Sequence, residues 1–318
     1  MRHPHYTVIC ALTLLLAWLA IANAETSQPK SFSVLSWNIS EDAFSRQPDA
    51  FEKTLAWANA DIVILDEVHP TADIDTFREQ LPGKSDWNIY VGSSGGRQLQ
   101  VIASRADVIG LPEFDGEIPY PESERLSLWE SMSLRARSNP DWTMDNGIPV
   151  SGAIVDNGEH RLLVVATDMQ CCGDTPQSWQ ERRRQIEARE VRRLIRKVLE
   201  RETVDGLIIA GDFNLVNGAF ALSILGGTYA EPVFGVTPAE VYHADGTSAW
   251  TWDGRRTPFP NGTLDFQLFS SSTLNPLSGS ILDTENADEA LLERTGLDAK
   301  SMMKTGRHRP LLVEYAWR

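Results

Sequence analysis

Six polar residues of this sequence stand where apolar runs begin or end. They are Asn38 after "VLSW", Glu67 after "IVILD", Asp212 and Asn214 after "LIIAG", Asp265 after "GTL" and His308 before "RPLLVEY". A single such residue most often caps a turn, but packed strands can also direct the polar residues at their ends into one cleft. Carboxylates, amides and an imidazole suit hydrolysis of a phosphate ester, which needs a divalent cation, a base and donors for the developing charge.

The apolar runs that carry these residues alternate with helical periodicity. Phe51, Leu55 and Ala58 recur at the spacing of one helix face, and Asn157-Gly158 favours a tight hairpin between two later runs. The pattern predicts an α/β fold with an antiparallel pair mixed into the sheet. The predicted strands are 32–39, 61–68, 87–92, 99–104, two within 152–168, 206–214, 262–270 and 311–317, and the predicted helices are 51–58, 74–81 and 180–202.

One long segment, Pro112 to Pro149, interrupts this alternation. It is rich in Pro, Glu, Ser and Asn, so we interpret it as an insertion. Its Trp129, Met132, Trp142 and Met144 suit two arrangements. They form a small hydrophobic cluster under a long loop, or they line a cleft or contact lipid.

The N-terminal residues have the features of a secretory signal peptide. Arg2 and His5 precede an apolar run from Val8 to Ala22, and small residues end it at Ala24. A membrane anchor would need about 20 apolar residues, and this run is shorter. We therefore expect cleavage after Ala24, a secreted or periplasmic protein, and a single domain over residues 25–318. No later run suits stable membrane insertion, and the formal net charge of −15 disfavours unspecific binding to nucleic acid or anionic membranes.

Two neighbouring cysteines, Cys171 and Cys172, lie outside that N-terminal segment. Neighbouring residues have Cα atoms about 3.8 Å apart, which is below the usual disulfide range of about 4.4–6.8 Å. Two interpretations stay open: two reduced, inaccessible thiols, or a strained and easily reduced bridge.

The polar residues at the strand ends lie in motifs that resemble the endonuclease/exonuclease/phosphatase superfamily of metal-dependent phosphoesterases. The motifs are "SWN" at 36–38, Glu67 after the second strand, "GDFN" at 211–214, "LDF" at 264–266 and "HRP" at 308–310. Their order extends over nearly the whole chain. The resemblance implies a four-layer α/β sandwich, in which two mixed β-sheets pack face to face and helices flank them.

The resemblance also implies roles for these residues. Glu67 would hold Mg²⁺ or Mn²⁺ with Asn38 beside it, because hard cations prefer oxygen ligands. Asp212 would orient and deprotonate the attacking water, and Asn214 would bind the transition state.

His308, held by Asp265, would contact the scissile phosphate, and two departures from the family pattern lie nearby. Family members commonly carry Asp before this His, where this chain has Arg307, and His or Asn at the end of the central strand, where it has Asp168. We interpret the two changes as compensating: Arg307 would pair with Asp168 and contact the substrate phosphate. The alternative is that Arg307 points to solvent and Asp168 caps a turn.

The sequence therefore predicts a secreted, divalent-metal-dependent hydrolase of phosphodiester or phosphomonoester bonds. The alternative is a catalytically degenerate relative that binds a phosphorylated ligand or a protein partner. The resemblance leaves nucleic acid, phospholipid and sugar phosphate open as substrates, because recognition loops vary most within a fold. The oligomeric state is also left open.

Overall fold

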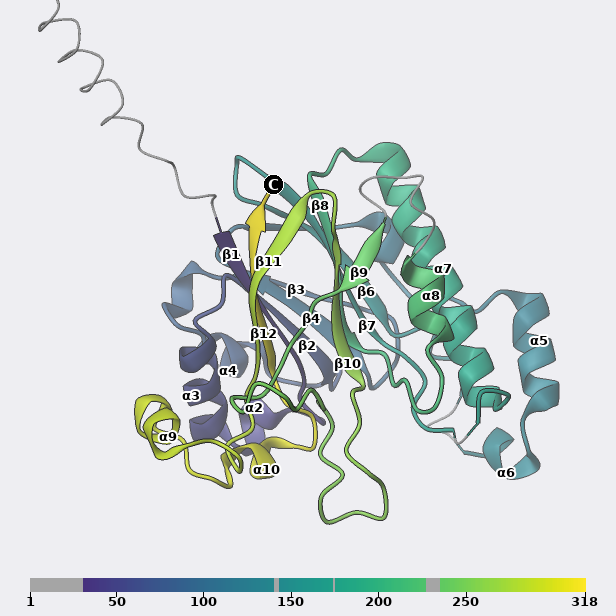
Figure 1. Cartoon of the computed structure of the whole chain (residues 1–318). Helices are drawn as coiled ribbons and strands as arrows, with labels where there is room; N and C mark the ends of the chain where they lie inside the picture. Colours follow the sequence, from purple (N-terminus) through teal and green to yellow (C-terminus); the bar gives the residue numbers. More distant parts are fainter. Residues whose placement is uncertain (1–30, 140–142, 174, 227–234) are drawn as a thin grey trace, which may run out of the picture. The chain divides into compact units, whose positions relative to one another are not determined.

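Two six-stranded β-sheets lie face to face in the computed structural model of this protein, with helices on their outer sides (Figure 1). The structure describes residues 31–139, 143–173, 175–226 and 235–318. The predicted α/β sandwich of two mixed sheets is confirmed. The signal peptide expected over residues 1–24 lies outside the described residues. Within the described part of the chain, no helix has the length and apolar composition needed to cross a bilayer.

The first sheet, called here the β1 sheet, has the strand order β11-β12-β1-β2-β4-β3. Its two central strands, β1 and β2, are parallel, and the other pairs are antiparallel. The strands are β1 (Ser31–Asn38), β2 (Ile62–Val68), β3 (Asn88–Val91), β4 (Leu99–Ser104), β11 (Leu274–Ile281) and β12 (Leu311–Trp317).

The second sheet, called here the β8 sheet, has the order β5-β6-β7-β8-β10-β9. It repeats the plan of the first, because a parallel central pair, β7 and β8, is flanked by antiparallel strands. The strands are β5 (Asp107–Gly110), β6 (Val150–Asp156), β7 (Arg161–Asp168), β8 (Gly206–Asp212), β9 (Val236–Pro238) and β10 (Asp265–Ser270).

Helices cover the outer face of each sheet (Figure 1). The helices on the β1 sheet are α2 (Ala43–Arg46), α3 (Pro48–Ala58), α4 (Ile74–Arg78), α9 (Glu289–Thr295) and α10 (Ser301–Thr305). The helices on the β8 sheet are η2 (Pro112–Phe114), α5 (Glu122–Ser131), α6 (Leu134–Arg137), α7 (Trp179–Arg201) and α8 (Phe220–Gly226). A short 3-10 turn, η1 (Lys84–Asp86), precedes β3.

The two sheets enclose an apolar layer formed by both. Val34 and Ile64 of the β1 sheet and Val164 and Ile208 of the β8 sheet are fully buried in it. The opposite faces of the central strands are buried too, under the helices. Burial on both faces explains why these strands are continuous apolar runs without an alternating pattern.

One polar side chain crosses the layer between the sheets. Gln267 of β10 donates through Nε2 to the backbone oxygens of Val34 and Leu311, at 3.1 and 3.2 Å, and to Ser36 Oγ at 3.1 Å. The side-chain oxygen of Gln267, Oε1, accepts a hydrogen bond from the Tyr315 hydroxyl at 3.1 Å. A buried polar group with these partners fixes the register of one sheet on the other, because any shift would leave it unpaired.

The segment predicted as an insertion, 112–149, folds as η2, α5 and α6 against α7. Phe114, Leu128, Met132 and Met144 are buried in the outer core of the β8 sheet, whereas Trp129 is 42% exposed. The apolar residues of this segment thus join the outer core of the β8 sheet and do not form a separate small cluster, and Asn146 and Pro149 near its end line a cleft. Trp142 lies outside the described residues.

The first position of the "GDFN" motif, Gly211, requires glycine. Its φ of +135° is disfavoured for any other residue, and a Cβ atom there would lie 2.1 Å from Thr167 O and 2.8 Å from Asp66 Oδ2. We expect Gly211→Ala to lower the free energy of unfolding by more than about 3 kcal/mol. Gly116→Ala is the matched control, because Gly116 has a φ of +72° but open space around it, and should cost about 1 kcal/mol. Equal losses in urea titrations of the two variants would contradict this account.

Candidate active site

The ends of the central strands of both sheets meet at one place. In the β8 sheet, Asp168, Asp212 and Asp265 are register neighbours on β7, β8 and β10, so three carboxyl groups stand in a row. All three are at least 98% buried. Like charges directly opposite one another are destabilising, so a row of this kind indicates a functional site.

Asn38, at the end of β1, connects the two sheets across this site. Its Nδ2 donates to Glu67 Oε1 at 3.0 Å and to Asp212 Oδ2 at 3.1 Å. Its Oδ1 accepts a hydrogen bond from Ser40 N at 3.0 Å. The amide oxygen is therefore turned away from the carboxyl groups in this structure, and the role of Asn38 as a metal ligand stays a prediction. Its contacts make it a residue that positions Glu67 and Asp212.

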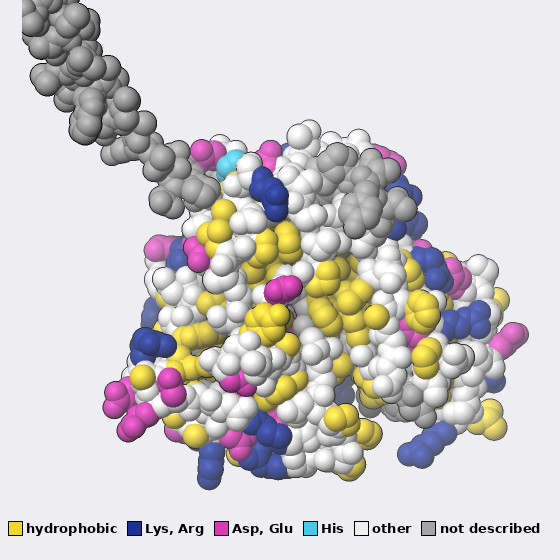
Figure 2. All heavy atoms as spheres, viewed as in Figure 1, with side chains coloured by type: hydrophobic (Ala, Val, Ile, Leu, Met, Phe, Trp, Pro, Cys, Tyr) yellow, Lys and Arg dark blue, Asp and Glu magenta, His cyan; other side chains and the backbone are white. Residues whose placement is uncertain are grey.

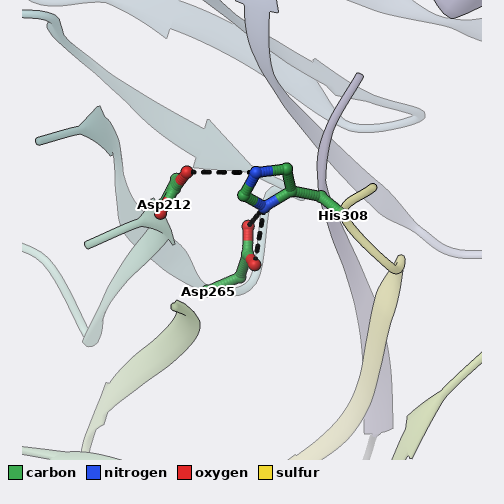
Figure 3. A group of neighbouring side chains, drawn as sticks. All are labelled: Asp212, Asp265 and His308. Carbon is green, nitrogen blue, oxygen red and sulfur yellow. Dashed lines mark hydrogen bonds and ion pairs between the residues drawn. The ribbon is translucent and has the colours of Figure 1, made fainter. Parts of the chain in front are cut away.

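His308 lies between two of the aspartates (Figure 3). Its Nδ1 is 2.9 Å from Asp265 Oδ2, and its Nε2 is 3.6 Å from Asp212 Oδ2. Burial alone would lower the pKa of His308, but Asp265 and Asp212 together raise it to about 10. His308 is therefore an imidazolium ion at neutral pH, held by Asp265 as predicted.

Thr251 supports this pair and was not found from the sequence. Its hydroxyl donates to Asp265 Oδ2 at 2.6 Å and accepts hydrogen bonds from the Leu264 and Asp265 amides at 2.9 Å. The backbone of His308 is held separately, because Trp37 Nε1 donates to its carbonyl oxygen at 3.2 Å. Thr251 lies in a long loop without apolar periodicity, so no sequence signal marked it.

The "GDFN" motif places Asp212 and Asn214 on one side and Phe213 on the other. Phe213 is fully buried in the outer core of the β8 sheet. Asn214 has a left-handed φ of +50°, and its backbone amide donates to Asp212 Oδ1 at 2.9 Å. Its Nδ2 donates to Met169 O at 2.8 Å and lies 3.4 Å from Asp168 Oδ1. If Asn214 binds a phosphate, as predicted, the phosphate oxygen would have to replace Asp168 Oδ1, which is the more distant of these two acceptors.

The predicted pair of Arg307 and Asp168 is not formed, which corrects that prediction. Arg307 is exposed, donates to the carbonyl oxygens of Asp253 and Arg255 at 3.2 and 3.4 Å, and lies 6.0 Å from the centroid of the Trp252 ring. Successive residues of an extended segment point to opposite sides. Because His308 points into the site, Arg307 points away from it.

Asp168 has different partners. Its Oδ2 accepts a hydrogen bond from Gln98 Nε2 at 2.7 Å. Burial, followed by Glu67 and Asp212, raises the pKa of Asp168 well above its usual value. Asp168 therefore belongs to the group of crowded carboxyls rather than to an arginine-carboxylate pair.

A cleft of about 260 Å³ opens beside the row of aspartates. Asp168, Glu67, Gln98 and Cys171 are among its lining residues. A larger hollow of about 610 Å³ lies at the opposite ends of the strands, where Ser31 and Trp317 are among its lining residues. The larger hollow is far from the row of aspartates, so the smaller cleft is the candidate substrate site.

A model of the Endonuclease/Exonuclease/phosphatase family matches residues 35–288. The chain belongs to this family. Membership of the endonuclease/exonuclease/phosphatase family makes the protein a phosphoesterase, a hydrolase of ester bonds. The matched residues include Asn38, Glu67, Asp212 and Asp265, whereas His308 follows them. No curated protein sequence matches the chain.

Solved structures share the fold of this family member at low sequence identity. TDP2 from D. rerio, complexed with a single-stranded DNA product, is 17% identical with a TM-score of 0.54, over 90% of this chain and 99% of that chain. The human Nocturnin catalytic domain with a bound sulfate anion is 15% identical with a TM-score of 0.57, over 91% and 95%. A family protein from Bacteroides thetaiotaomicron is 15% identical with a TM-score of 0.56, over 92% and 99%.

Glu67 lies in an irregular stretch of β2, the strand that carries it to the family site. The pairing of β2 with β4 shifts register between Leu65 and Val68, and Glu67 has a left-handed φ of +56°. Bulges re-aim side chains at strand ends, and strained backbone conformations cluster at functional sites. Glu67 is half-buried and lines the cleft, which suits a ligand that must reach a bound ion.

Asp66, next to Glu67, is a further carboxyl that the sequence did not reveal. It is fully buried, and neither of its oxygens has a hydrogen-bond partner among the described residues. Burial, followed by Asp212, Asp265 and Glu67, raises the pKa of Asp66 well above its usual value. An unpaired buried carboxylate is costly, so the site favours a positive charge near it.

The donor set fits a hard divalent cation. Five carboxyl groups converge here with one imidazolium among them: Asp66, Glu67, Asp168, Asp212 and Asp265. Asp212, Asp265 and His308 offer possible ligand atoms within 4.8 Å of one another. These three side chains are already paired with one another, so the half-buried Glu67 is the better candidate for the principal metal ligand. Oxygen donors of this kind suit Mg²⁺ or Mn²⁺.

We expect Asp66→Asn to stabilise the protein in chelator at pH 8. A carboxyl whose folded-state pKa is raised costs stability above that pKa, and the cost disappears as the pH falls below the pKa of the unfolded state. The variant should therefore gain roughly 2 kcal/mol at pH 8, and the gain should vanish near pH 4. Thermal melts from pH 4 to pH 8 measure this gain. A gain in stability that did not change with pH would contradict Asp66 as its cause.

Proposed function

We propose that this phosphoesterase is a divalent-cation-dependent phosphodiesterase that acts after export from the cytoplasm. The observation that carries the chemistry is the Asp212 carboxylate, which is fixed on both oxygens and lies between the Asn38 amide and the His308 imidazolium. Export is supported by the N-terminal sequence, in which an apolar run ends in small residues at Ala24.

Asp212 is the general base in this proposal. Asn38 Nδ2 and the Asn214 amide donate to its two oxygens, so the carboxylate is fixed in its orientation. Burial raises the pKa of Asp212 to about 8, with His308 opposing and Asp265 and Glu67 adding to the effect. A base with a pKa near the working pH removes a proton from water effectively. The hydroxide attacks phosphorus, and the ester oxygen leaves with the bonding electron pair.

His308 supplies the positive charge that the phosphate needs. Its Nδ1 is engaged with Asp265, but the 3.6 Å between Nε2 and Asp212 Oδ2 is too long for a hydrogen bond. The Nε2 proton is therefore available to a phosphate oxygen. Such a donor stabilises the transition state most when the surrounding protein already holds it in place.

Glu67, positioned by Asn38, would be the principal ligand of the cation in this proposal. When bound, a divalent cation neutralises phosphate oxygens and lowers the pKa of a bound water. The excess of carboxyl groups over basic groups in the site supports this dependence.

A small phosphodiester suits this site better than a long nucleic acid. The two arginines that line the cleft are each paired with a glutamate, Arg97 with Glu41 at 3.1 Å and Arg183 with Glu187 at 3.0 Å. On the face shown in Figure 2, Lys and Arg side chains are scattered among Asp and Glu side chains. Long polyanions bind through continuous basic surfaces, whereas a small nucleotide, lipid headgroup or sugar phosphate diester requires only the strand-end groups.

Hydrolysis of bis-(4-nitrophenyl) phosphate is expected to require Mg²⁺ or Mn²⁺ and to stop in EDTA. Glu67→Gln should raise the cation concentration for half-maximal activity at least tenfold. Glu52→Gln on α3 removes the same charge from an exposed position and should leave that concentration unchanged. Hydrolysis that resists the chelator would contradict the dependence, and absence of hydrolysis with every cation would support the alternative of a degenerate, ligand-binding relative.

Asp212→Asn is expected to lower kcat at least about a hundredfold with little change in KM, because the carboxylate acts mainly in the transition state. Asp107→Asn, at the opposite end of the β8 sheet and exposed, is the control for loss of one charge. Steady-state kinetics with saturating Mn²⁺ gives both constants. A variant with wild-type kcat would exclude Asp212 as the base.

A further inference from the structure

Two free cysteines follow shortly after the end of β7. Cys171 is half-buried and lines the cleft, and Cys172 is exposed. Their sulfur atoms are 2.7 Å apart. The expectation of two inaccessible thiols is therefore wrong for Cys172, which a reagent in solution can reach.

A buried arginine holds the two cysteines in this arrangement. Arg184 of α7 donates through Nη1 to Gln170 O and to Cys172 O, both at 2.8 Å, and its Nε donates to Glu181 Oε2 at 2.9 Å. The carbonyl groups on either side of Cys171 are thus bound to one guanidinium. Cys172 has a left-handed φ of +70°, so the chain turns sharply where the thiols meet.

The same segment carries acceptors and donors of the active site. Met169 O accepts the hydrogen bond from Asn214 Nδ2, and the Gln170 amide donates to Glu187 Oε2 at 2.8 Å. Asp168 begins the segment. A change of backbone conformation at Cys171 and Cys172 would therefore displace Met169 O, which holds Asn214 and lies at most three residues away in the sequence.

We propose that Cys171 and Cys172 are a site of reversible thiol-disulfide modification, and that closing the bond slows catalysis by displacing the segment from Asp168 to Cys172. Bond formation is independent of the proposed phosphodiesterase function. The effect on catalysis rests on that function.

The exchange reaction needs an external disulfide, for which oxidised glutathione serves. The Cys172 thiolate attacks one sulfur of that disulfide, forms a mixed disulfide and releases one glutathione thiolate. The Cys171 thiol then loses its proton to solvent, attacks the Cys172 sulfur and releases the second. Two protein thiols are oxidised, and one glutathione disulfide is reduced to two thiols.

The surroundings favour Cys172 as the attacking residue. The hydrogen bond from the Cys171 thiol lowers the pKa of Cys172 to about 7, burial opposes this, and Arg184 adds to it. A thiol with a pKa near the ambient pH is the most effective in exchange. Because a bridge between neighbouring residues is strained, reduced glutathione should open it again.

The test uses the full chain with Cys10→Ser, so that only two thiols remain. The protein is equilibrated in glutathione buffers of graded ratio, alkylated and weighed by mass spectrometry. We expect both thiols to be lost in one reversible transition. Turnover of bis-(4-nitrophenyl) phosphate should fall about tenfold across the same transition, as expected for loss of one positioning hydrogen bond. Hydrogen exchange of the peptide 168–173 should rise with it.

Two matched variants separate the bond from other effects of oxidation. Cys171→Ser and Cys172→Ser should fold and show no two-thiol transition, and the turnover of each variant should not change with the glutathione ratio. Glutathione captured as a stable mixed disulfide would overturn the proposed pair. A bond that forms without change in turnover or in exchange would overturn the coupling. If no diester is hydrolysed in either state, the proposed function fails, and hydrogen exchange alone decides whether the bond displaces the segment.

Discussion

The spacing between the two sheets is the constraint on which the active site depends. Asn38 ends β1 and His308 lies just before β12, both in the β1 sheet, whereas the aspartates that they contact come from the β8 sheet. The critical contacts, including 3.1 Å from Asn38 to Asp212, therefore cross the space between the sheets. That space is set by interlocking apolar side chains packed at the density of a crystal and by Gln267, which bonds to both neighbouring strands of the other sheet. A small displacement of one sheet would therefore separate Asp212 from its amide donor even if no catalytic residue were substituted.

The same packing forces carboxyl groups into low dielectric, and this opposes stability. The site offsets the cost locally: Asp212 has two amide donors, Asp265 has Thr251 and His308, and Asp168 has Gln98. Asp66 lacks such a partner among the described residues. The compensation is thus complete for the groups that face His308 and incomplete on the side of Glu67, where a cation is expected. The pattern of satisfied and unsatisfied oxygens indicates where the positive charge belongs.

Local patterns predicted an α/β fold and its strand-end residues, whereas the sandwich of two packed sheets was predicted only through the family resemblance. A strand buried on both faces must be continuously apolar, so a polar residue such as Asp212 is visible at its end. Asp66 was missed because it directly precedes Glu67 and looked like part of the same polar end. Thr251 was missed because long-range packing of an aperiodic loop brings it to Asp265. The direction of the Arg307 side chain could not be predicted from the sequence. Alternation says that Arg307 and His308 point to opposite sides, but it does not say which of the two side chains points into the site.

Arg307 and Asp168 together change how charge must be supplied in this family member. The family pattern given by the resemblance has a carboxylate before His308, where this chain has Arg307, and none at Asp168; here Asp168 is bound to Gln98 and the exposed Arg307 points to solvent. No guanidinium therefore replaces a missing ligand within the described site, and the arginines of the cleft are neutralised by glutamates. In the proposed function, His308 and a cation held from the side of Glu67 would provide the positive charge that a phosphate diester requires. The described site supplies a single imidazolium against five carboxyl groups, and this imbalance is the reason for proposing that the site needs a cation.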